Sequence, residues 1–162
     1  MSRKRIAVLM ASIDREYQQD FANGLASAGT KYDTDICIFN SQGHMNVAVS
    51  TSESGESGIY DLVNLSDFDG IISMPATMGN DVALKKVFDV LKPLKGKPHV
   101  SIDVVQDGAV TILFDDKISM EELTEHLIVQ HGARRIAFVS GPLSSNVATD
   151  RIEACRNAMK KH

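Results

Sequence analysis

The chain has 162 residues, about the length of one domain, and 43% of them are hydrophobic while 23% are charged. This balance allows a substantial buried core and excludes the disordered and fibrous classes. The formal net charge is -4 and the sequence pI is about 5.7, so we expect no surface in this segment that collects nucleic-acid phosphates.

The cysteines and the N-terminus indicate in which cellular compartment the protein works. Cys37 and Cys155 are too few for a disulfide framework and lack metal-ligand spacing, so we expect small core residues. The apolar run 6–11 follows basic residues but is shorter than the hydrophobic region of a signal peptide. No run approaches the length of a membrane-spanning helix. We therefore expect a cytoplasmic protein with no membrane contact.

Short apolar, β-branched runs alternate along the chain with stretches of helical period. The runs predict strands at 6–10, 36–39, 70–74, 99–102, 110–114 and 136–139. The stretches between and after them predict helices at 16–29, 57–66, 80–92, 118–131 and 147–159. This alternation is typical of βαβ units, and strands that are apolar on both faces suit a sheet covered on both sides. We predict a three-layer α/β sandwich with a parallel sheet.

Three segments carry further signals: the start of the fourth predicted helix, the region 41–58 and the final helix. Ser119 is the predicted start of the fourth helix, which Gly132 ends. The segment 41–58 is rich in Ser, Gly and Thr and predicts a long surface loop, either functional or a variable insertion. The final helix carries an apolar stripe that needs a partner surface, so we expect a homodimer with that helix exchanged or packed across the interface. The stripe consists of Ala148, Ile152, Cys155 and Met159.

Most chemical motifs are missing from the sequence. There is no Gly-x-Gly-x-x-Gly fingerprint and no Gly-x-Ser-x-Gly elbow, and the segment 24–31 that resembles a phosphate loop closes a helix instead of opening one. His126 and His131 are five residues apart, about 140° around a helix, so helical spacing does not let them share one metal ion. We predict no metal site and no cofactor.

The remaining candidates are polar residues that follow predicted strands. In open parallel sheets, ligands bind beyond the carboxyl ends of the strands. Each candidate also has an ordinary interpretation as a helix cap or turn former. The candidates are Ser12, Asp14, Arg15 and Tyr17 after the first strand, Thr77 after the third, Asp103 after the fourth, Asp115 and Asp116 after the fifth, and Ser144 and Ser145 after the sixth.

The C-terminal third resembles the lac-repressor and galactose-repressor family. The residues that carry this resemblance are Glu125–Ile128, Gly132–Phe138, Gly141, Pro142, Leu143, Ser144, Ser145, Ala148 and Arg151. Weaker similarity covers 68–73, 101–103 and 113–116. The resemblance implies the N-terminal lobe of a type I periplasmic-binding-protein-like domain, with strand order 2-1-3-4-5. It places this lobe at 1–142, followed at 143–162 by the crossover and first helix of a second lobe.

The resemblance also implies a function. Two such lobes clasp a small effector, a sugar, nucleoside or small acid, and their closure rearranges a dimer; the module is regulatory and not an enzyme. It assigns ligand contact to Arg151 and an Asp-Asn pair to Asp115 and Asp116, the second position being changed here. Ile118, Ala133 and Ala154 also depart from the family pattern, which puts a standard sugar pocket in doubt. A sensor domain of a diguanylate cyclase or histidine kinase, and an interaction module without ligand, remain open.

Overall fold

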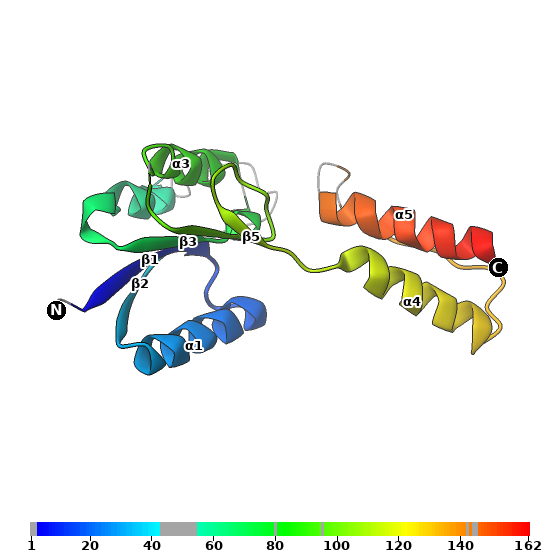
Figure 1. Ribbon diagram of the computed structural model, residues 1–162. Coiled ribbons are helices and arrows are strands. Elements are labelled where there is room, and N and C mark those ends of the chain that lie inside the picture. Colours follow the sequence, from blue (N-terminus) through cyan, green and yellow to red (C-terminus); the bar gives the residue numbers. More distant parts are fainter. Residues whose placement is uncertain (1–2, 43–54, 80, 95, 142, 144–145) are drawn as a thin grey trace. The chain divides into compact units, whose positions relative to one another are not determined.

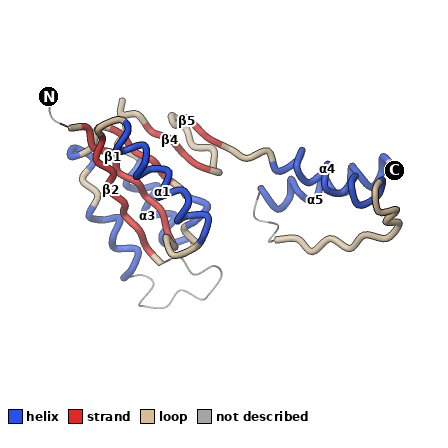
Figure 2. Tube along the Cα trace, turned by 90° about the horizontal axis from the view of Figure 1, so that it is seen from below, coloured by secondary structure: helices blue, strands red, loops and turns tan. Residues whose placement is uncertain are grey.

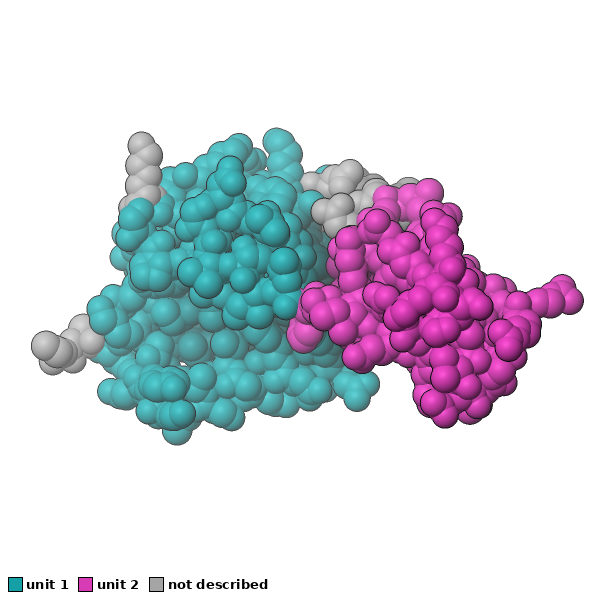
Figure 3. Space-filling view, turned by 45° about the vertical axis from the view of Figure 1, so that its right-hand side comes forward, with its two compact units in different colours: residues 1–113 teal, residues 114–162 magenta. Residues whose placement is uncertain are grey.

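The structure is a computed structural model that describes residues 3–42, 55–79, 81–94, 96–141, 143 and 146–162. Most of the predicted loop at 41–58, together with Pro142, Ser144 and Ser145, lies outside the described residues. The chain forms two compact units, Met1–Leu113 and Phe114–His162, which Figure 3 colours separately. We describe each unit by itself.

The first unit is built on a parallel five-stranded sheet in the order β2-β1-β3-β4-β5, as predicted. The strands are β1 Lys4–Ala11, β2 Thr34–Ser41, β3 Gly70–Ser73, β4 His99–Ile102 and β5 Val110–Ile112. Helix α1, Glu16–Lys31, covers one face of this sheet, and α3, Asp81–Leu91, covers the other (Figures 1 and 2). The three-layer arrangement of this unit is therefore confirmed.

The central strand β1 feeds both layers of the core. Successive side chains of a strand point to opposite faces. Ala7 and Leu9 belong to the core on the α3 side, whereas Val8 and Met10 belong to the core that includes Phe21 of α1. All four β1 residues are fully buried. This double burial explains why the sequence of β1 is a continuous apolar run instead of an alternating one.

The segment between β2 and β3 is less regular than the predicted helix at 57–66. It contains the 3-10 segments η1, Ser57–Leu62, and η2, Leu65–Asp67. Asn64 lies between them, and its side-chain oxygen accepts a hydrogen bond from the Ser66 amide at 3.2 Å. This local bond competes with helix continuation, so the helical run breaks at Asn64. A third short segment, η3 Pro75–Thr77, follows β3.

The second unit contains two helices, α4 Asp116–Val129 and α5 Asn146–Lys161, which pack together. Lys117 pairs with Asp150 and Glu153 near the starts of both helices, and Lys161 pairs with Glu125 farther along. This order of ion pairs shows that the helices run parallel. The chain must therefore run back between the two helices, and the described residues 130–141 belong to this return segment.

The predicted sixth strand at 136–139 is wrong. Residues 132–141 have no strand assignment, and Val139 is 94% exposed. A strand forms only beside a hydrogen-bonded neighbour, and within the described residues every strand belongs to the five-stranded sheet of the first unit. The apolar run is therefore an irregular segment and not a strand.

The final helix has a partner in its own chain. Helix α5 packs on α4, and its buried residues are Ala148, Ala154, Cys155 and Ala158. Of the predicted stripe, Ala148 and Cys155 are buried, while Ile152 is half-buried and Met159 is 38% exposed. The compact units divide at 113/114, where β5 has ended, whereas the predicted division at 142/143 counted α4 with the first lobe. That division into lobes remains a prediction.

Candidate functional site

The carboxyl ends of β1 and β3 are tied together by Thr77. Its hydroxyl accepts from the Ala11 amide at 3.0 Å and donates to the Met74 carbonyl at 2.7 Å. Ser12, the next residue, is buried, has a φ of 57° and donates its amide to the Ser41 carbonyl at 2.8 Å. Such a conformation is uncommon for a residue with a side chain and fixes the sharp exit from β1. Through these contacts, Ser12 and Thr77 fix the loops that follow β1 and β3 at the carboxyl edge of the sheet.

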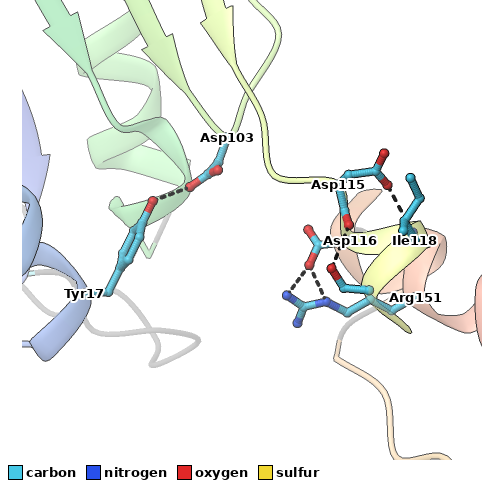
Figure 4. Close-up of polar contacts among 7 residues, drawn as sticks. Tyr17, Asp103, Asp115, Asp116, Ile118 and Arg151 are labelled. Carbon is cyan, nitrogen blue, oxygen red and sulfur yellow. Dashed lines mark hydrogen bonds and ion pairs between the residues drawn. The ribbon is translucent and has the colours of Figure 1, made fainter. Parts of the chain in front are cut away.

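Tyr17 and Asp103 meet at the same edge of the sheet, as Figure 4 shows. The Tyr17 hydroxyl donates to Asp103 Oδ2 at 3.0 Å. Asp103 has a φ of 62° directly after β4, and its amide donates to the Ile112 carbonyl at 2.9 Å, so both backbone and side chain are fixed. Burial, followed by the bond to Asp103, raises the pKa of Tyr17 to about 12. The phenol is therefore a neutral donor near pH 7.

Asp14 and Arg15 lie in the turn between β1 and α1. Both side chains are exposed. The Arg15 amide donates to the Ser12 carbonyl at 3.0 Å, and the Asp14 carbonyl accepts from the Gln19 amide group at 3.2 Å. A backbone bond and the Gln19 side chain thus hold the turn, and neither bond uses the Asp14 carboxylate or the Arg15 guanidinium.

The remaining predicted residues belong to the second unit. Asp115 caps α4 by accepting from the Ile118 amide at 3.1 Å (Figure 4). It replaces the predicted start Ser119, whose hydroxyl donates to the Asp115 carbonyl. Arg151 donates through Nε to Asp116 Oδ1 at 2.8 Å and through Nη2 to the same oxygen at 2.5 Å. Arg151 and Asp116 thus form an ion pair between α5 and α4, and about half of the arginine side chain is exposed.

The structure therefore brings the predicted residues together in two groups, one in each unit. Ser12, Asp14, Arg15, Tyr17, Thr77 and Asp103 belong to the first unit, and Asp115, Asp116 and Arg151 to the second. Sequence reasoning missed Asn40, whose side-chain oxygen accepts from the Ile13 amide at 3.0 Å and supports the loop that carries Asp14. Its position at the end of β2, among the other strand-end polar residues, was the available signal.

Sequence reasoning also missed a buried polar network on the α3 side of the sheet. His99 Nε2 lies 2.9 Å from Ser73 Oγ, and Gln106 donates to Ser73 Oγ at 3.3 Å and to Ser101 Oγ at 3.1 Å. Burial lowers the pKa of His99 below its usual value. Ser73 is fully buried, so its hydroxyl is closed to a substrate despite the nearby imidazole. The network is suited to holding β3, β4 and the following loop together.

An open cavity of about 780 Å³ lies beside this network. It is lined by the end of α3, the turn before β4 and the loop 106–108, with Phe88, Leu91, Pro98 and His99 among the lining residues. Its volume is within the range of small-molecule sites. However, none of the predicted site residues lines it, and it lies near the start of β4 and not at the carboxyl end of that strand.

The two histidines at the end of α4 are closer than helical spacing predicts. The helix ends at Val129, so His131 does not follow the helical repeat. His131 Nε2 lies 3.1 Å from His126 Nε2. Helical spacing therefore does not describe the placement of these two rings, because His131 lies beyond the end of α4. Within the described residues, no three His, Cys, Asp or Glu side chains gather into a group that could hold a metal ion.

Comparison with known proteins gives one consistent fold. No model of a known protein family matches the chain. Catabolite control protein A of Staphylococcus xylosus is 25% identical over 162 residues, which covers 97% of this chain and 44% of that protein. The solved structure of the transcription regulator CcpA of Lactococcus lactis matches with a TM-score of 0.72 at 19% identity, over 99% of this chain and 54% of that one.

A second solved structure gives the same result. The lac repressor dimer bound to operator and the anti-inducer ONPF matches with a TM-score of 0.66 at 16% identity, over 99% of this chain and 52% of the repressor chain. The chain thus spans about half the length of the proteins it resembles. Its fold is the periplasmic-binding-protein-like fold of LacI-type regulators.

Proposed function

We propose that this chain is part of the small-molecule-sensing domain of a LacI-type transcription regulator. The observation that carries the proposal is the match to CcpA of Lactococcus lactis over 99% of the chain. In the proposed mechanism, an effector binds more tightly to one closure state of two lobes and shifts their equilibrium toward that state. The differential contacts, and not the affinity alone, carry the signal.

Named residues on both units can supply those contacts. Tyr17 and Asp103 offer a hydroxyl and a carboxylate at the strand-end edge of the first unit, where Asp14 and Arg15 add exposed charges. In the second unit, Arg151 offers a planar guanidinium fork that suits hydroxyl or carboxylate oxygens, and Asp116 holds it until an effector competes. We propose that an effector rich in oxygen atoms, such as a sugar, nucleoside or small acid, uses these groups.

The alternatives have less support. The proteins matched above are transcription regulators, which favours this function over the sensor domain of a diguanylate cyclase or histidine kinase. The same matches disfavour an enzyme, and so does the burial of Ser73, a serine whose hydroxyl lies within hydrogen-bond distance of His99. The third alternative is an interaction module that binds no small molecule. In that case no compound would change the thermal stability of the chain, whether or not Tyr17, Asp103 or Arg151 is substituted.

The same comparison supports proposals about the oligomeric state and the cellular location of the protein. Three lac repressor structures that this chain resembles are of dimeric repressors, and we propose a homodimer here too. Within the part of the chain that the structure describes, no helix is both long enough and apolar enough to cross a bilayer. We propose a cytoplasmic regulator whose sensing segment itself makes no contact with nucleic acid or membrane.

Thermal unfolding with a ligand panel tests the proposal. One structural neighbour is complexed with D-xylulofuranose and another is bound to ONPG, so the panel contains D-xylulose, ONPG, nucleosides and small organic acids. A ligand at 100 times its Kd stabilises the folded chain by about 2.7 kcal/mol, which raises Tm measurably.

Matched variants locate the response. We expect Asp103→Ala and Arg151→Ala to remove most of the Tm increase. Asp67→Ala should leave it unchanged, because Asp67 is exposed and is not one of the proposed contact residues. If every compound in the panel leaves Tm unchanged, or if the shift persists in both variants, the proposed effector site is wrong. Turnover of a panel compound would instead support an enzyme.

A further inference from the structure

The end of α4 brings two imidazole rings together at the surface. Gly132, with a φ of 65°, reverses the chain after the helix, and the Ala133 amide donates to the Leu127 carbonyl at 3.0 Å. His131 lies inside this turn with its ring beside that of His126, and the ring centroids are 4.9 Å apart at an interplanar angle of 70°. Both histidines are exposed, and their Nε2 atoms are 3.1 Å apart.

We propose that His126 and His131 form a surface site for a divalent transition-metal ion, bound through the two Nε2 atoms. A Zn–N bond is about 2.0–2.1 Å long. Two nitrogens bound to one ion at angles between 90° and 109° are therefore separated by roughly 2.9–3.4 Å. The observed separation of 3.1 Å lies in this range. The rings need little rearrangement to admit the ion between them.

The chemistry of the site selects the class of metal. Neutral imidazole suits Zn²⁺, Cu²⁺ and Ni²⁺, whereas Mg²⁺ and Ca²⁺ require oxygen ligands. The C-terminal end of a helix also favours a bound cation, since the carbonyl dipoles point toward it. Because no third protein ligand gathers at this place within the described residues, water completes the coordination and the ion is exchangeable.

A bound ion has a structural consequence that a simple ring contact lacks. It joins the last turn of α4, through His126, to the turn that follows, through His131. The same 3.1 Å separation also fits a hydrogen bond from one Nε2–H to the other Nε2 without any metal. A hydrogen bond gives no response to metal ions, so titration separates the two interpretations.

The test uses the 162-residue chain and metal salts alone. Zn²⁺ is titrated in competition with a chromophoric chelator, and Cu²⁺, Ni²⁺ and Mg²⁺ are titrated in parallel by calorimetry. The variants are His126→Gln, His131→Gln and the double variant. His162→Gln is the matched control, because His162 is another histidine at the surface of the same unit. Circular dichroism confirms that each variant is folded.

We expect one equivalent of ion per chain, with Cu²⁺ bound more tightly than Ni²⁺ or Zn²⁺ and with no binding of Mg²⁺. Each single variant should lose at least about tenfold in affinity, a change of about 1.4 kcal/mol, and the double variant should lose the site. The ion should raise the Tm of the wild type but not that of the double variant. Equal binding by the wild type and the double variant would overturn the proposal, as would an equal loss in His162→Gln.

Discussion

At the residue scale, the buried Tyr60 hydroxyl connects three parts of the first unit. Its oxygen lies 2.7 Å from the Met10 carbonyl oxygen, 2.8 Å from Ser41 Oγ and 3.0 Å from Met78 Sδ. Tyr60→Phe leaves buried polar partners without their hydrogen bonds, so we expect a loss of about 1–3 kcal/mol in the free energy of unfolding. Urea denaturation measures it. Tyr32→Phe is the control because Tyr32 is 67% exposed, and an equal loss there would contradict the role of Tyr60.

His99 makes the stability of the fold depend on pH. Burial lowers its pKa below 6.5 in the folded chain, so near and below pH 6.5 the unfolded chain binds more protons than the folded one. The free energy of unfolding therefore falls as pH falls from 6.5 toward the folded pKa. His99→Gln keeps a hydrogen-bonding group beside Ser73 and removes this titration.

Urea midpoints measured above and below pH 6.5 test this linkage. We expect the midpoint of His99→Gln to change less between the two conditions than that of the wild type. His162→Gln controls for the loss of any histidine. An unaltered pH dependence in His99→Gln would show that the buried imidazole does not contribute to acid destabilisation.

At the element scale, two glycines of α1 have opposite roles. A Cβ at Gly29 would lie 2.9 Å from the Thr34 carbonyl oxygen and 3.1 Å from Ile36 Cγ1, whereas nothing lies within 4 Å of a Cβ at Gly24. Gly29 thus allows the end of α1 to approach β2. In urea denaturation we expect Gly24→Ala to stabilise by about 0.5–1 kcal/mol through helix propensity. We expect Gly29→Ala to destabilise by about 1–3 kcal/mol through overpacking. Stabilisation by both would show that α1 shifts freely.

The same scale shows what the sequence can predict and why the rest escapes it. The strand β4 coincides with its predicted range because His99–Ile102 is a short buried run between turns. Local capping is less predictable, since Asp115 and Ser119 are both good caps and only the backbone geometry selects Asp115. The run at 136–139 has strand composition, yet a strand also depends on a neighbour that composition does not encode.

The candidate site shows a similar limit. Sequence position alone placed Tyr17 and Asp103 after different strands, and parallel topology correctly implied that such residues share an edge. By contrast, the proximity of His126 and His131 depends on where α4 ends and on the turn at Gly132. Helical spacing gives the wrong angle once the chain leaves the helix, so this pair required coordinates.

At the scale of the whole molecule, the second unit exposes apolar surface. Val139 is 94% exposed, and Leu123 is 54% exposed. Burying such side chains against another copy stabilises an assembly by about 1.5–3 kcal/mol for each one fully buried. The packing of α5 on α4 weakens the case for a dimer through the terminal helix, because that helix already has a partner in its own chain. Ile152 is half-buried in this unit, so a charge introduced there would disturb the helix pair itself. The exposed residues are better probes of association.

Light scattering over a concentration series tests the homodimer with these probes. We expect the wild type to form dimers at high micromolar concentration and the double variant Leu123→Asp with Val139→Asp to remain monomeric, because a buried aspartate would have no compensating partner. Leu62→Asp is the matched control, since Leu62 is 70% exposed but belongs to the first unit. We expect this variant to dimerise like the wild type. A wild-type monomer at every concentration would rule the homodimer out, and a dimer that persists in the double variant would place the interface elsewhere.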